Sequence, residues 1–101
     1  MTKESAKSQT VEQQNLVNKL VCRFITENFL SPPRDQYGKE ISQNEYSEII
    51  DVSSSVLSKM KNEKGYNIPL STINRICEKE KISLSDFFQR FEKRFPEAII
   101  K

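Results

Sequence analysis

The chain has 101 residues, of which 36% are hydrophobic and 30% charged, and its formal net charge at pH 7 is +2. This length suits one small domain with a core of its own, which excludes a two-domain enzyme and a disordered tail. With only two glycines, and no Asn-Gly, Asp-Gly or Gly-Gly pair, an all-β chain with frequent tight turns is disfavoured. We therefore expect an all-α domain.

The composition also limits the classes of partner. No apolar run approaches the ~20 residues needed to span a bilayer, so we expect a cytoplasmic protein without a membrane partner. The chain has no histidine, and Cys22 and Cys77 lack Cys-x-x-Cys spacing, so we expect no metal and no cofactor. The missing histidine also removes the commonest general base, which disfavours an enzyme. Both thiols are expected to be passive.

The N-terminal third predicts an arm and a long helix. Residues 1–10 are polar without apolar periodicity, so we predict a flexible arm before a single domain over residues 11–101. From about residue 11 to 29 the apolar positions follow one helical stripe, from which Cys22 is absent. The stripe consists of Val17, Leu20, Val21, Phe24 and Ile25. Two prolines at 32 and 33 end this helix, and a loop is expected to Glu40.

The clearest helix start lies at Ser42. Ser42 and Glu45 have the spacing of a capping box, in which each side chain binds the backbone N–H of the other residue. The helix that follows is predicted to turn Tyr46, Ile49 and Ile50 inward. About three residues later, Ser53 can cap a second short helix, with Val56, Leu57 and Met60 on one face. The pattern predicts two short helices joined by a tight turn.

Two more helices are predicted after a loop over residues 62–69. Leu70, Ile73, Ile76 and Cys77 recur at helical spacing. Ser83 and Asp86 mark another helix start. The last helix carries four phenylalanines on one side and stops at Pro96; these are Phe87, Phe88, Phe91 and Phe95.

The run Ile41-Ser42-Gln43-Asn44-Glu45-Tyr46-Ser47-Glu48-Ile49-Ile50-Asp51-Val52-Ser53-Ser54-Ser55-Val56-Leu57-Ser58-Lys59-Met60 resembles the helix-turn-helix (HTH) of Cro/C1 or Xre-type repressors of phage and bacteria. The similarity continues to Ile82-Ser83-Leu84-Ser85-Asp86-Phe87-Phe88. Asp51 takes the place of the family's turn glycine, which is tolerated because Asp visits left-handed conformations. The resemblance implies a five-helix bundle of lambda-repressor-like type, with a long N-terminal helix, a Phe-rich C-terminal helix and the motif at 42–61.

The resemblance also implies a site. The partner would be duplex DNA, and a recognition helix at about 54–61 would enter its major groove. The protein would then act as a sequence-specific transcriptional regulator. The residues it places toward bases are Ser54, Ser55, Ser58 and Lys59. Those it places toward phosphates are Gln43, Asn62, Lys64 and the Gly65 amide. Lysine can donate to guanine O6 and N7, whereas serine discriminates little between bases.

Less specific interpretations stay open for these residues. The serine cluster at 53–55 is also typical of a solvated cap, and the lysines are typical of an exposed helix face. A homodimer is expected, since one HTH unit makes few contacts, with an interface at Phe88, Phe91 and Phe95 extending to the Ala98-Ile99-Ile100 tail. The stripe of the first helix is a second possible interface. The alternative function is an HTH-fold protein-interaction module that has lost DNA binding.

Overall fold

The computed structural model describes residues 2–98 of the chain, and side chains from Asn15 onward. It contains α1 (Thr2–Phe29), α2 (Gln43–Ile50), α3 (Ser54–Met60), α4 (Leu70–Glu80), α5 (Leu84–Arg94) and a final 3-10 turn, η1 (Pro96–Ala98). Within residues 2–98 there are five α-helices and no strand, apart from one isolated bridge between Arg34 and Glu40. The all-α, five-helix prediction is confirmed. None of the helices described is both long and apolar enough to cross a membrane.

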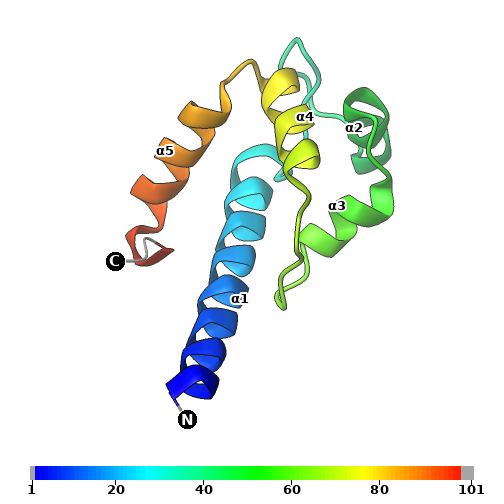
Figure 1. Ribbon diagram of the computed structural model, residues 1–101. Coiled ribbons are helices and arrows are strands. Elements are labelled where there is room, and N and C mark those ends of the chain that lie inside the picture. Colours follow the sequence, from blue (N-terminus) through cyan, green and yellow to red (C-terminus); the bar gives the residue numbers. More distant parts are fainter. Residues whose placement is uncertain (1, 99–101) are drawn as a thin grey trace.

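The long helix α1 is the element around which the others are arranged (Figure 1). It contacts α3 on one side and α5 and η1 on the other, while α2 packs on α3 and α4, and α4 packs on α5. Helix α1 begins at Thr2, so the predicted start near Val11 is wrong. Lys, Glu, Ala and Gln favour a helical backbone even without an apolar stripe, which accounts for the longer helix. The predicted flexibility of residues 1–10 stays a prediction.

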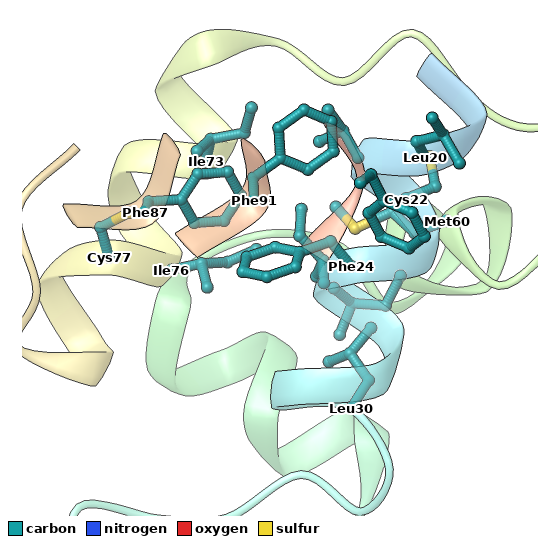
Figure 2. Packing of buried hydrophobic residues seen from close by; sticks show 14 of the residues in the cluster. Leu20, Cys22, Phe24, Leu30, Met60, Ile73, Ile76, Cys77, Phe87 and Phe91 are labelled. Atoms are coloured by element: carbon teal, nitrogen blue, oxygen red, sulfur yellow. The ribbon is translucent and has the colours of Figure 1, made fainter. Parts of the chain in front are cut away.

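One hydrophobic core joins all the helices. Its centre is aromatic: the Phe24 ring of α1 lies edge-to-face against Phe87 and Phe91 of α5, with centroids 5.2 and 5.8 Å apart. Figure 2 shows these rings between the aliphatic side chains of α1 and α4. The buried apolar residues are Leu20, Val21, Cys22, Phe24, Ile25, Leu30, Tyr46, Ile50, Leu57, Met60, Ile73, Ile76, Cys77, Phe87, Phe91, Phe95 and Ala98.

Two positions depart from the predicted stripes. The apolar periodicity leaves Cys22 outside the stripe of its helix, but Cys22 is buried. The loop between α3 and α4 covers this side of α1, and the Tyr66 carbonyl accepts from Cys22 Sγ at 3.3 Å. Ile49 was predicted to face inward but is 49% exposed. The small side chain of Ser47 is buried instead, and its hydroxyl donates to the Asn44 carbonyl at 2.6 Å. The inner face of α2 is therefore centred on Tyr46, Ser47 and Ile50.

A partly buried polar cluster contacts the loop that precedes α2. Lys79 of α4 donates to the Arg34 carbonyl in the loop and pairs with Glu80 at 3.0 Å, while its ammonium lies 5.0 Å from the centre of the Tyr46 ring. The Tyr46 hydroxyl donates to Glu80 at 2.8 Å. Burial and this carboxylate raise the pKa of Tyr46 well above its usual range, so the hydroxyl keeps its proton. The loop and the start of α2 are thus held against α4.

Candidate nucleic-acid interface

Helix α2 starts where the capping box predicts. The hydroxyl of Ser42 accepts from the Glu45 backbone N–H at 3.1 Å, and the Glu45 carboxylate accepts from the Ser42 N–H at 3.4 Å. These bonds satisfy two of the N–H groups that a helix start leaves without partners. The predicted register of the motif is confirmed at this end.

The turn between α2 and α3 has the geometry of an HTH. Asp51 adopts the left-handed conformation, with φ 57° and ψ 47°, as expected for the residue in place of a turn glycine. Its carboxylate also pairs with Arg75 of α4 at 3.2 Å, which ties the turn to the rest of the domain. Ser53 then caps α3 by accepting from the Val56 N–H at 3.4 Å. The turn between α2 and α3 therefore combines a left-handed residue, an ion pair to α4 and a helix cap.

A glutamine couples the first turn of α2 to the outer face of α3. Gln43 Nε2 lies 3.0 Å from the Ser54 carbonyl oxygen, 3.1 Å from Ser54 Oγ and 2.9 Å from Ser58 Oγ. A carbonyl oxygen can only accept, so the nitrogen of the Gln43 amide must face it. The nitrogen has two N–H groups for these three oxygens, so two of the oxygens share one N–H. A serine hydroxyl that accepts in this way keeps its own proton for another partner. The sequence did not predict these bonds, because they join residues on two different helices.

The residues predicted to face bases lie on one side of α3. Leu57 and Met60 are buried against the core, whereas Ser55, Ser58 and Lys59 are exposed and Ser54 is half-buried. The Lys59 ammonium lies 5.5 Å from the centre of the Tyr66 ring, within the range of a cation–π contact. The outer face of α3 is therefore made of hydroxyl groups and one lysine.

The loop after α3 carries the residues predicted to face phosphates. Asn62 and Lys64 are exposed, and the Asn62 side-chain oxygen accepts from the Lys64 N–H at 2.9 Å. The Gly65 N–H donates to the Asn62 carbonyl at 3.0 Å, so it is used inside the loop instead of being free for a phosphate. Gly65 has φ +86°, and a Cβ there would lie 2.8 Å from Lys19 Cγ and 3.1 Å from Lys19 Cα. Glycine is required at 65 because the loop rests directly on α1.

The charge along this surface is positive. Lys59, Lys61 and Lys64 are exposed, with Glu63 as the one acidic residue in the same stretch. Phosphate groups are attracted to such a cluster at the end of a recognition helix. Among the residues described, no group of three or more His, Cys, Asp or Glu side chains could hold a metal ion.

The phenylalanines predicted to form a dimer interface lie in α5 and at its C-terminal end, away from the outer face of α3. Phe91 and Phe95 are 4% and 2% exposed, since both pack into the core of their own chain, and Phe88 is half-buried. Phe91 and Phe95 therefore do not form an exposed apolar surface, and the predicted interface at these residues does not fit the packing. The predicted extension to Ile99 and Ile100 falls outside the residues described.

Comparison with known proteins agrees with this geometry. Residues 38–93, more than half of the chain, match the model of the Cro/C1-type HTH DNA-binding domain. The matched region covers α2 to α5 apart from the last residue of α5, and it includes the capped turn and the outer face of α3. Neither curated proteins nor solved structures give a significant match.

Proposed function

The chain belongs to the Cro/C1-type HTH DNA-binding family, and from this membership and the site geometry we propose a sequence-specific, duplex-DNA-binding transcriptional regulator. Helix α3 enters the major groove and turns Ser54, Ser55, Ser58 and Lys59 toward base edges. Asn62, Lys64 and the backbone N–H groups at the first turn of α2 contact phosphates on either side, whereas the side-chain amide nitrogen of Gln43, predicted to face a phosphate, is already bonded to α3.

The bonds from Gln43 to α3 carry this proposal. Ser54 and Ser58 accept from Gln43 Nε2, so each hydroxyl can donate its own proton outward. Acceptors suited to such donors in the major groove are guanine O6 and N7, thymine O4 and adenine N7. Lys59 adds a cationic donor suited to guanine. The surface therefore favours bases that present acceptors, with modest discrimination at each position.

Selection from a random duplex library, followed by salt titration of the selected site, tests the proposal. Phosphate contacts require log K to fall steeply with log salt. The Lys64→Ala variant should weaken binding to all sequences alike and reduce the salt slope by about one. The Gln43→Ala variant should instead change the selected sequence, because Ser54 and Ser58 lose their common partner. A wild-type chain that selects no sequence and shows no salt slope would refute the proposal.

Such a refutation would favour the second candidate function, a protein-interaction module on an HTH fold. The serine-rich outer face of α3 and the low net charge of +2 support this candidate. Both features reduce the attraction for phosphates without affecting the core.

Pairing two half-sites would raise the affinity of so small a unit, and we propose a homodimer. The α1 stripe that the sequence offered as a second interface is also buried, apart from the half-buried Val17, so neither predicted interface is available. The large apolar side chain that α1 exposes among the residues described is Leu16, outside that stripe and 41% exposed, and we propose that the dimer forms there. Sedimentation equilibrium at tens of micromolar should show a wild-type dimer and a Leu16→Glu monomer. A monomeric wild-type chain would contradict the proposed dimer.

A further inference from the structure

A basic groove lies between α1 and α5, on the other side of α1 from the recognition helix. It has a volume of about 420 Å³ and is lined by Phe24, Glu27, Asn28, Arg90, Lys93 and Arg94. We call it the α1–α5 groove. Arg90, Lys93 and Arg94 come from one face of α5, since residues three and four apart are neighbours on a helix.

The positive charge of the α1–α5 groove exceeds what its own acid can neutralise. Glu27 Oε2 lies 3.2 Å from an Arg94 nitrogen and 3.4 Å from Arg23 Nε, so one carboxylate is shared by two guanidinium groups. Arg90 and Lys93 are exposed and have no ion-pair partner among the residues described. The groove therefore presents two cations outside any ion pair, beside a third that shares its carboxylate with Arg23.

Part of this groove is already fixed in position. The Arg94 guanidinium lies 4.3 Å from the centre of the Phe95 ring, and Phe95 is buried. Stacking of this kind orients the planar guanidinium and limits the entropy lost when it binds a carboxylate with two hydrogen bonds. The groove is thus prepared for a partner with several carboxylates.

The location of the α1–α5 groove argues against the same DNA duplex binding both there and at α3. Helix α1 contacts both α3 and α5, and no contact joins α3 to α5 within residues 2–98. Figure 1 shows α1 between the two helices. A second copy bound groove to groove is also disfavoured, because that two-fold interface would bring the two basic surfaces together.

We propose that the α1–α5 groove docks an acidic segment of a partner protein. Carboxylates of the segment bind Arg90 and Lys93, and Arg94 adds a third contact at the edge of its pair with Glu27. A regulator built this way would hold DNA and a partner on opposite sides of α1.

A fluorescein-labelled peptide of ten glutamates is the probe, measured by anisotropy at physiological salt. The Arg90→Gln/Lys93→Gln variant should bind it about tenfold more weakly than wild type, since two charge-assisted contacts are lost. Its binding to random duplex DNA should stay within about twofold of wild type. The matched control, Lys61→Gln/Lys64→Gln, removes two positive charges from the side of α1 that faces α3. It should weaken binding to duplex DNA and leave binding of the peptide within about twofold of wild type. Circular dichroism melts confirm folding, which is expected because all four residues are exposed.

Three outcomes would overturn this proposal. Equal loss of peptide binding in both variants would show general attraction of polyanions. Equal loss of duplex binding in both would make the groove a nucleic-acid surface. A wild-type chain whose amide ¹H–¹⁵N shifts at Asn28, Arg90 and Lys93 do not respond to the peptide would show that the groove is not its site, and this last measurement needs no variant.

Discussion

Helices α3 and α5 are both capped by a serine and both bury one face, but different interactions hold them. Helix α5 has 11 residues, and its Phe87 and Phe91 pack edge-to-face on Phe24. Helix α3 has 7 residues, too few to be stable alone in water. Its position depends on the Ser53 cap, two buried side chains and the bonds from Gln43. The side of the domain around α5, which we call the aromatic side, is held by the packing of its rings. The side around α2 and α3, which we call the recognition side, combines buried aliphatic side chains with polar contacts.

The same comparison separates the two outer faces. The exposed side of α3 presents hydroxyls and Lys59, whereas that of α5 presents Arg90, Lys93 and Arg94. Hydroxyls suit base edges, while guanidinium groups suit carboxylates. The outer residues of either helix can therefore change without disturbing the core that both share.

The largest expected effect is on the aromatic side. Phe91→Ala should lower the free energy of unfolding by about 3–5 kcal/mol, because a buried ring is replaced by a cavity beside Phe24. Urea denaturation measures it, with the half-buried Phe88→Ala as the control that should cost less. Equal effects of the two substitutions would show that α5 is not packed as described.

On the recognition side, the largest expected effect is on DNA binding rather than on folding. Lys59→Ala should weaken binding to the selected site by about 1–3 kcal/mol and relax the preference at one base pair per half-site. Lys61→Ala removes the same charge beside it and should weaken all sequences alike. A binding-site selection that gives an unchanged preference for Lys59→Ala would show that this side chain does not read a base.

Two serine caps, one at the start of α2 and one at the start of α5, allow the same substitution to be compared on the two sides of the domain. Ser42→Ala and Ser83→Ala each remove a cap, of α2 and of α5, and each should cost about 0.5–2 kcal/mol of stability in a thermal melt. Only Ser42→Ala should also weaken DNA binding, because α2 carries Gln43 and α5 is far from α3. Loss of DNA binding in the Ser83 variant would mean that the two sides are coupled.

Local patterns in the sequence were sufficient for most of the fold. The capping box at Ser42, the serine caps of α3 and α5 and the left-handed Asp51 depend on residues within a few positions of each other, so the motif and its register could be predicted. The burial of Phe91 and Phe95 could not, because periodicity identifies an apolar face but not the neighbour that covers it. In this chain the cover is α1 and η1.

The candidate site shows the same limit. The outward positions on α3 followed from helical spacing, but the bonds from Gln43 to Ser54 and Ser58 depend on how α2 and α3 cross. Likewise, Gly65 was assigned to phosphate contact from the family pattern, and the contact with Lys19 that requires a glycine comes from α1, outside that pattern. Contacts between distant segments set the details that spacing alone leaves undetermined.

The smallest expected effect is on the reactivity of the two thiols, which report on the two sides separately. Burial raises the pKa of both Cys22 and Cys77, so little thiolate is present in the folded chain, and alkylation requires local opening. Cys22 is covered by the loop after α3, through the Tyr66 carbonyl, whereas Cys77 belongs to α4 and lies in the same core cluster as Phe87 (Figure 2). Iodoacetamide labelling followed by mass spectrometry should therefore show Cys22 reacting faster than Cys77, with both slower than in the urea-unfolded chain. Faster labelling of Cys77 would show that the core around α4 and α5 opens more readily than the loop that covers Cys22, which contradicts the order of stability proposed for the two sides.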